Sequence, residues 1–330
     1  MINSEPNTEL SEHDRRIREK LRRELGPIIC EYLQDPSVVE IMLNPDGRLW
    51  VERHGAPMES FGRMSPATAE ALMGTVASTL KTQITASNPI LECELPFDGS
   101  RFEALIPPIV EAPAFTIRRK AIRVFTLQDY VSKGIMTVAQ MTAIKNAVIQ
   151  SQNILVVGGT ATGKTTLTNA IIHFISEAVP DDRLVIIEDT RELQCSSKNV
   201  VALRSNDGVS MTRLLRATMR LRPNRILVGE VRDGSALALL KAWNTGHPGG
   251  VATLHANSAP AGLIRLETLV AEATQAPMQN LIAEAVNVVI AIAVEKGGRK
   301  IQEVVSVRGY DGQNYITEPI SEDYYERSVA

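Results

Sequence analysis

Residues Gly158 to Thr165 read GGTATGKT and fit the pattern G-x-x-x-x-G-K-[ST] of a phosphate-binding loop. The loop follows the apolar run NILVV and precedes the helix-forming run TTLTNAIIHFIS, as this motif requires. Its glycines let backbone N–H groups turn toward phosphate oxygens, and the helix dipole adds positive potential. We expect the nucleotide phosphates to be bound by Gly158, Gly159, Thr160, Ala161, Thr162, Gly163, Lys164, Thr165 and Thr166. Lys164 would reach the β- and γ-phosphates, and the Thr165 hydroxyl would bind Mg²⁺.

Acidic residues follow two other apolar runs. Glu188 and Glu192 come after LVII, and Glu230 follows RILVG. The carboxyl ends of parallel strands converge on one crevice, so these acids are expected near the phosphate loop. Glu230 is predicted to hold Mg²⁺ or to polarise the attacking water, and Glu188 and Glu192 are further candidates for activating water. Taken singly, each acid would be interpreted as a solvent-facing charge at a strand end.

Histidine and arginine complete the set of candidates. His255 ends the apolar run VATL, and with His247 in the same segment it is interpreted as a sensor of the nucleotide state; their spacing is not that of a zinc site. Phosphoryl transfer also benefits from a cation that neutralises charge in the transition state. Most arginines are surface ion-pair partners. The candidates are Arg101 and Arg118 in the first half, and Arg213, Arg216, Arg220 and Arg222 before Glu230.

The second half of the chain alternates apolar strand-like runs with helical stretches. Runs that are apolar throughout and separated by helices predict a mainly parallel sheet covered on both faces. The predicted strands are Asn153–Val157, Leu184–Ile187, Ile226–Val228, Val251–Leu254 and Val288–Val294, and a helix is expected over Thr137–Ile149.

The first half reads as α+β. A helical stripe from Ile17 to Leu33 is interrupted at Gly26-Pro27. The sequence Asn44-Pro45-Asp46-Gly47 predicts a hairpin turn, and Ser65-Pro66 predicts the start of a helix that runs to about Leu80. Strands are further expected at Ile90–Leu95, Arg101–Ile106 and Phe115–Arg118. We predict an α+β domain over residues 1–122, a linker over 123–136 and an α/β domain over 137–330.

Composition restricts the class of protein. The 330 residues carry a net charge of −3, which gives no basic excess for bulk nucleic-acid binding. The three cysteines form neither a disulfide framework nor a CxxC metal pattern. The first residues contain no apolar leader, and the apolar run Val286–Val294 is far shorter than the ~20 residues that span a bilayer. Cytoplasmic residence is therefore expected.

Four segments in order, GTATGKTT, IIEDTREL, RPNRILVGEVRD and GHPGGVATLHAN, resemble the Walker A, Asp box, Walker B and His box of the secretion or traffic ATPases. VVEIMLNPDGRLWVER and LPFDGSRFEALIPPIVEAPAFTIRRK in the first half resemble the conjugal-transfer (Trb-type) branch of the type IV secretion ATPases. The resemblance covers about residues 15 to 315. One departure is Asn224, where many relatives carry Asp.

The resemblance implies a RecA-like P-loop domain that binds ATP and Mg²⁺ and forms a homohexameric ring. It implies an ATPase on the cytoplasmic side of the inner membrane, peripheral to it, that powers conjugative transfer with inner-membrane components of a type IV secretion system. In the family pattern, Glu230 is the Walker B catalytic acid, Glu188 and Glu192 are Asp-box acids and His255 is the His-box sensor. Arg101 and Arg118 would reach the nucleotide from the N-terminal domain.

Two alternatives stay open. The first is a type II secretion or type IV pilus assembly ATPase of the same superfamily, although the chain lacks the four-cysteine zinc element of type II assembly ATPases. The second is a nucleotide-dependent module that acts on DNA, which the absence of a basic excess disfavours. No sequence-specific binding of nucleic acid is expected.

Overall fold

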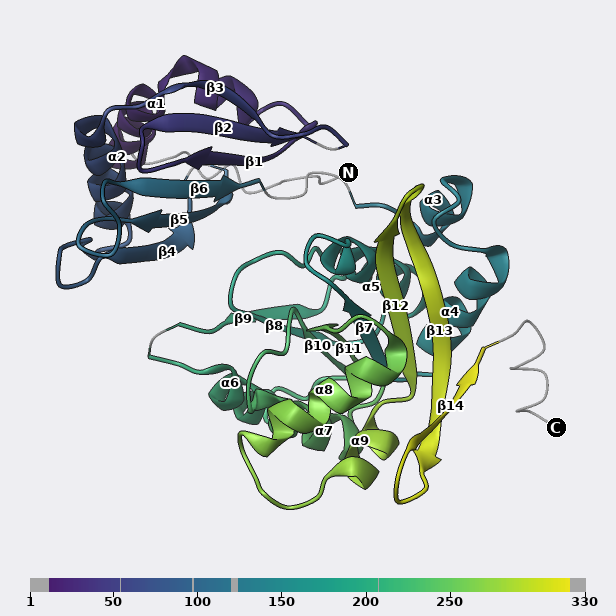
Figure 1. The fold of residues 1–330 in the computed structure, drawn as a ribbon. Coiled ribbons are helices and arrows are strands. Elements are labelled where there is room, and N and C mark those ends of the chain that lie inside the picture. The colour runs from purple at the N-terminus through teal and green to yellow at the C-terminus, as the bar shows by residue number, and fades with distance from the viewer. Residues whose placement is uncertain (1–11, 54, 97, 120–123, 207, 321–330) are drawn as a thin grey trace, which may run out of the picture. The chain divides into compact units, whose positions relative to one another are not determined.

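The described part of the chain forms two compact units, each with its own sheet, in a computed structural model (Figure 1). The structure describes residues 12–53, 55–96, 98–119, 124–206 and 208–320. Unit 1 contains the described residues up to 119, and unit 2 contains those from 124 onward. The predicted boundary between residues 122 and 123 lies outside the described residues. Residues 1–11, for which the sequence predicts no secretory leader, also lie outside the described residues.

Unit 1 is an antiparallel sheet of six strands in the order β3-β2-β1-β6-β5-β4. Two helices accompany it, and residues of both contribute to its core. The helices are α1 (Glu12–Tyr32) and α2 (Pro66–Thr79). The strands are β1 (Val38–Leu43), β2 (Arg48–Arg53), β3 (Glu59–Arg63), β4 (Ile90–Glu94), β5 (Arg101–Leu105) and β6 (Ala114–Arg118).

Local sequence signals set the helix geometry in unit 1. The interruption expected in the first helix is confirmed, because Gly26 takes a φ of 79° just before Pro27 inside α1. Glycine reaches this left-handed conformation without a steric cost. The start of α2 is also as predicted: the Ser65 hydroxyl accepts a hydrogen bond from the Thr68 N–H, and Pro66 occupies the first turn.

Unit 2 is built on an eight-stranded sheet in the order β14-β13-β12-β7-β11-β10-β8-β9. The strands from β12 to β9 in this order run parallel, and β13 and β14 are antiparallel additions. The strands are β7 (Ile154–Gly158), β8 (Leu184–Glu188), β9 (Val200–Arg204), β10 (Arg225–Val228), β11 (Val251–His255), β12 (Val288–Glu295), β13 (Gly298–Tyr310) and β14 (Tyr315–Pro319). The mainly parallel sheet predicted from the apolar runs is therefore present.

Helices cover both faces of this sheet (Figure 1). One core cluster joins the sheet to α6 (Met211–Thr218), α7 (Ser235–Asn244), α8 (Ala259–Ala271) and α9 (Gln279–Ala285). The other joins it to α3 (Leu127–Ser132), α4 (Val138–Ile149) and α5 (Lys164–Ala178). Successive residues of β7 alternate between the two clusters, with Leu155 and Val157 in one and Ile154 and Val156 in the other. Burial on both faces explains why the strands are apolar throughout.

Part of the segment expected to be a linker, residues 123–136, is folded. It contains α3, whose start is fixed by a capping box between Thr126 and Asp129. Leu127 and Tyr130 of α3 are buried in the same core cluster as residues of α4 and α5. This packing attaches α3 to unit 2, because burial of apolar side chains outweighs the polar character of the surrounding sequence.

The amino ends of the parallel strands are fastened by Arg225, whose side chain is 2% exposed. Its Nε donates to Oδ2 of Asp182 at 2.6 Å, and its other nitrogens donate to the carbonyl oxygens of Val148 and Gly249 and to the hydroxyl of Ser151. A buried cation is tolerated because it is paired and hydrogen-bonded in this way. Arg225 therefore joins several segments at the amino ends of the parallel strands, opposite the carboxyl ends where the phosphate loop begins.

Asn224 belongs to this amino-terminal edge. Its Oδ1 accepts the Arg183 N–H at 2.9 Å, and its own N–H donates to the Arg183 carbonyl, so it ties the start of β10 to the start of β8. His247 lies nearby and contacts the Pro223 carbonyl at 3.0 Å. Asn224, which differs from the Asp of many relatives, thus lies at the end of the sheet away from the phosphate loop. His247 lies at the same end, which gives no support to its interpretation as a nucleotide sensor.

Within the described residues, no helix combines the length and the hydrophobicity needed to cross a bilayer.

Candidate active site

The phosphate loop connects the last residue of β7, Gly158, to the first residue of α5, Lys164. Gly163 stands at the helix N-cap with a φ of 98°, and no side chain caps the first turn of α5. A Cβ atom on Gly158 would lie 2.5 Å from both the Ile292 carbonyl oxygen and the Thr162 hydroxyl. Glycine is therefore required at both positions, and the uncapped N–H groups of the first turn suit an anion.

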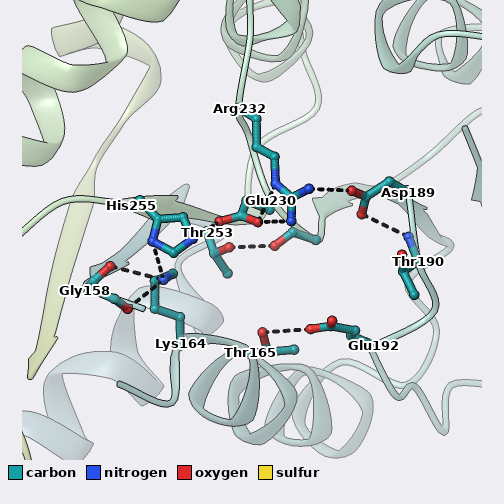
Figure 2. A network of polar contacts seen from close by, with 12 residues as sticks. Gly158, Lys164, Thr165, Asp189, Thr190, Glu192, Glu230, Arg232, Thr253 and His255 are labelled. Atoms are coloured by element: carbon teal, nitrogen blue, oxygen red, sulfur yellow. Dashed lines mark hydrogen bonds and ion pairs between the residues drawn. The ribbon is translucent and has the colours of Figure 1, made fainter. Parts of the chain in front are cut away.

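Lys164 is 7% exposed and its ammonium group lies inside the loop. Its Nζ donates to the carbonyl oxygens of Gly158 at 3.0 Å and Gly159 at 2.9 Å, and it lies 3.2 Å from Nδ1 of His255 (Figure 2). Three donors on one ammonium account for these three contacts. The arrangement places a buried cation where the phosphate loop must neutralise anionic oxygens.

His255 lies between the phosphate loop and the acid of the next strand. In the sheet order, β11 separates β7 from β10, and the register pairs His255 with Gly158. Partial burial lowers the pKa of His255; the Glu230 carboxylate opposes this, and Lys164 and Arg232 reinforce it. A neutral ring accepts from Lys164 at Nδ1 and carries its proton on Nε2, which lies 2.6 Å from Oε1 of Glu230. The imidazole therefore lies between Lys164 and Glu230 and contacts both.

Glu230 follows β10, and its side chain is 13% exposed. Its backbone is held by β11: the Thr253 hydroxyl donates to the Gly229 carbonyl at 2.6 Å, and the Val231 N–H donates to the Thr253 carbonyl at 3.0 Å. Gly229 leaves little room for a side chain, because a Cβ would lie 3.1 Å from Cγ of Glu188, which would have to shift by a few tenths of an ångström. Glu230 stands two residues after Val228, the last residue of β10.

Glu188 and Glu192 have different surroundings. Glu188 is buried, and its Oε1 accepts the N–H groups of Glu192 at 2.9 Å and Leu193 at 2.8 Å. Glu192 points to the phosphate loop, where its Oε2 accepts the Thr165 hydroxyl at 3.2 Å. Of the two Asp-box acids, Glu192 thus meets the expected Mg²⁺ ligand directly, and Glu188 shapes the loop that carries Glu192.

Burial of Glu188 gives a testable pH dependence of stability. Desolvation raises its pKa from 4.5 to about 7, against the effect of the two N–H groups that it accepts. Because the folded state then binds more protons between pH 4.5 and about 7, the free energy of unfolding decreases as pH rises through that range. Glu188→Gln keeps the accepting oxygen without the charge. We expect the stability of the variant relative to wild type to increase by about 2–3 kcal/mol between pH 5 and pH 8.

Denaturant unfolding at the two pH values measures this difference. The chain has two tryptophans, Trp50 in unit 1 and Trp243 in unit 2, so a Trp50→Phe background makes fluorescence report on unit 2. Glu295→Gln, at an exposed strand end, serves as the control. A stability difference between Glu188→Gln and wild type that is the same at pH 5 and pH 8 would contradict the interpretation.

Three residues of this region, Asp189, Arg232 and Arg299, are not among the predicted site residues. Arg232 lies between the carboxylates of Glu230 and Asp189, to which it donates at 2.6 and 2.9 Å. The sequence does point to Asp189 and Arg232, because Asp189 follows the predicted acid Glu188 in EDTREL and Arg232 follows the predicted acid Glu230 in GEVRD. Arg299 on β13 donates to the Ala161 carbonyl at 3.4 Å, and its side chain lies against Gly163. No local pattern connects Arg299 with the loop.

The predicted arginines belong to other elements. Arg101 and Arg118 are directly paired neighbours on β5 and β6 of unit 1, and Arg118 lies 3.6 Å from Glu40 on β1. Their approach to a nucleotide stays a prediction. The second set, Arg213, Arg216, Arg220 and Arg222, is exposed on or just after α6.

The residues around the loop suit a nucleotide with magnesium. The Thr165 hydroxyl and the carboxylates of Glu192 and Glu230 are hard oxygen donors, the type that Mg²⁺ prefers. Among the described residues, no group of three or more His, Cys, Asp or Glu side chains is arranged to hold a metal ion. In nucleotide sites Mg²⁺ is usually held by one or two protein groups together with the phosphates. The donors around Thr165 fit that mode of binding.

Comparison with known proteins shows the family to which the chain belongs. The profile of a family described as "Type II/IV secretion system protein" matches residues 23–302. The chain belongs to this family. The resemblance to the secretion ATPases inferred from the four motifs is thereby confirmed.

Individual relatives cover nearly the whole chain. Conjugal transfer protein TrbB of Rhizobium radiobacter is 53% identical over 323 residues, which cover 98% of this chain and 100% of that protein. Protein VirB11 of Agrobacterium fabrum is 31% identical, over 82% of this chain and 89% of its own. The crystal structure of the pilus retraction motor PilT with bound ADP has a TM-score of 0.62 at 19% identity, and covers 92% of this chain and 87% of that one. The predicted fold, a RecA-like P-loop domain preceded by an α+β domain, is confirmed.

Proposed function

We propose that this secretion-family protein is a Mg²⁺-dependent ATPase that powers conjugative transfer through a type IV secretion system. The observation that carries the proposal is the direct linkage of three motif residues, in which His255 contacts both Lys164 of the phosphate loop and Glu230 after β10. The 53% identity with a conjugal transfer protein over almost the full length supports the biological assignment.

The chemistry follows from the positions of the side chains. Lys164 would neutralise the β- and γ-phosphate oxygens, which the loop N–H groups also bind. Thr165, Glu192 and Glu230 would hold Mg²⁺, which when bound screens the negative charge of the phosphates. Glu230, which contacts His255 and Arg232, would orient the attacking water and accept its proton. The imidazole of His255 would transmit the state of the phosphate loop to Glu230.

We further propose that the active form is a homohexameric ring on the cytoplasmic face of the inner membrane. Arg101 and Arg118 of unit 1 would supply cations to the nucleotide, and the angle between the two units would respond to hydrolysis. The partners would be inner-membrane components of the secretion machine. The identity with TrbB favours conjugation over the alternative of type II secretion or pilus assembly.

Two measurements on the full chain test these proposals. Purified protein is assayed for release of phosphate from ATP with Mg²⁺ and with excess EDTA, and its native mass is measured with and without a non-hydrolysable ATP analogue. We expect Mg²⁺-dependent turnover and a six-fold mass. Absence of turnover would refute the ATPase, and a monomer under both conditions would refute the ring. A donor strain that lacks the gene, but keeps normal mating frequency, would refute the role in conjugation.

A further inference from the structure

The guanidinium group of Arg232 bridges two carboxylates that come from different strands of unit 2. Its Nε donates to Oε2 of Glu230 at 2.6 Å, and its Nη1 donates to Oδ2 of Asp189 at 2.9 Å. Glu230 follows β10 and Asp189 follows the neighbouring β8. Figure 2 shows the Arg232 guanidinium between the two acids, with His255 on the other side of Glu230. A planar fork with several N–H donors is suited to join two carboxylates, whereas an ammonium group is a point charge.

On one side, Arg232 restrains the acid proposed to activate water. The Oε1 atom of Glu230 is buried, and among the described residues no hydrogen bond of good geometry reaches it, although Nε2 of His255 lies 2.6 Å away. The Oε2 atom is held by charge-assisted hydrogen bonds from Arg232. A glutamate side chain has three rotatable bonds, so these contacts fix where its carboxylate lies.

On the other side, Arg232 restrains the loop that carries Glu192. Asp189 is the first residue of that loop, and its Oδ1 accepts the Thr190 N–H at 2.8 Å. The far end is fixed by Glu188, which accepts the Glu192 N–H, and Glu192 itself meets the Thr165 hydroxyl. Arg232 thus ties the acid after β10 to the segment that reaches the phosphate loop.

The exposure of this bridge indicates what it does. The side chains of Arg232 and Asp189 are 51% and 41% exposed. Ion pairs with that much exposure contribute about 0–1 kcal/mol to stability. A displacement of a reacting group by about 1 Å, in contrast, can reduce a rate about 100-fold. The Arg232–Asp189 half of the bridge therefore matters far more for geometry than for folding.

We infer that Arg232 is a positioning residue that, anchored by Asp189, holds Glu230 and the Glu192 loop in one fixed arrangement at the ATP site. The inference rests on the proposed ATPase function for its kinetic consequence. Its structural consequence, restraint of the segment 189–193 in the nucleotide-free protein, is independent of hydrolysis.

Kinetics of the full chain give the first test, with the variants Arg232→Gln, Arg232→Lys and Asp189→Asn. We expect Arg232→Gln to lower kcat for ATP about 10- to 100-fold while KM changes less than about threefold. Arg232→Lys should recover only part of the loss, because it cannot bridge both acids. Asp189→Asn should add no further loss in the Arg232→Gln background, since the two residues act as a unit. Arg308→Gln removes a comparably exposed ion pair, to Glu318 on β14, and should leave kcat unchanged.

Hydrogen exchange gives the second test without nucleotide. We expect the peptide that contains residues 189–193 to exchange roughly tenfold faster in Arg232→Gln than in wild type or Arg308→Gln, with similar melting temperatures in all three. Unchanged exchange would overturn the inference, and so would wild-type kcat in Arg232→Gln when the wild type is active. If the wild type releases no phosphate, the ATPase proposal fails, and exchange alone decides the role of Arg232.

Discussion

Replacement of Lys164 by alanine is expected to reduce ATP turnover at least about 1,000-fold. The Nζ of Lys164 is the buried cation inside the phosphate loop, held by the carbonyl oxygens of Gly158 and Gly159. Cations that stabilise the transferring phosphoryl group contribute factors of about 10³–10⁵ in kcat. Since alanine leaves the loop without this charge, the affinity for ATP should fall as well. Steady-state phosphate release and binding of a fluorescent ATP analogue measure the two effects.

The control for this variant is Lys198→Ala, which removes an exposed lysine of the same unit. It should keep the turnover and affinity of the wild type. Because Lys164 is buried, circular dichroism and melting temperature must show that Lys164→Ala is folded. A folded Lys164→Ala protein with wild-type turnover would remove the phosphate loop from the mechanism.

Replacement of Glu230 by glutamine should separate binding from hydrolysis. Glutamine keeps the length of the side chain and one oxygen that can accept from Arg232, but it cannot take a proton from water. General-base catalysis contributes about 10²–10⁴ in rate, so kcat should fall by about that factor. The affinity for ATP should stay within a few-fold of wild type, because Lys164 and the loop are unchanged. Single-turnover hydrolysis and equilibrium binding distinguish the two quantities.

Glu295→Gln is the matched control for Glu230→Gln, because Glu295 is an exposed acid at the end of β12. It should hydrolyse ATP at the wild-type rate. If Glu192→Gln lost kcat at unchanged affinity while Glu230→Gln did not, the assignment of the general base would move to Glu192, which contacts Thr165.

Much of the fold could be predicted from local sequence. The strands buried on both faces, such as β7 and β8, are apolar throughout, and the predicted turn at Asn44-Pro45-Asp46-Gly47 has Gly47 at a φ of 79°. The apolar runs do not predict the edge strand β9, because its residues alternate between exposed and partly buried and form no fully buried run. The strands β13 and β14 were also overlooked. They extend the sheet by antiparallel pairing, which periodicity of the parallel part does not indicate.

The part of the candidate site that lies in a sequence motif could be predicted, because the motif fixes the positions of its side chains. The loop fixes Lys164 and Thr165, and convergence of strand ends brings Glu230 and His255 to them. The different surroundings of Glu188 and Glu192 were not predictable, because they depend on which backbone N–H groups a carboxylate meets after the chain turns. The contact of Arg232 with Asp189 depends on the sheet order, which places β10 beside β8, and the contact of Arg299 with the phosphate loop depends on the pairing of β12 with β7.

The close approach of Gly229 to Glu188 restricts how this site can change during evolution. A Cβ at position 229 would lie 3.1 Å from Cγ of Glu188, so a side chain there requires the Glu188 side chain to shift by a few tenths of an ångström. An aspartate directly after β10 is therefore expected to fit more readily when a shorter residue stands at position 188. The two positions, though distant along the chain, are expected to vary as a pair, and a substitution tolerated in one relative is expected to be harmful when moved alone into another.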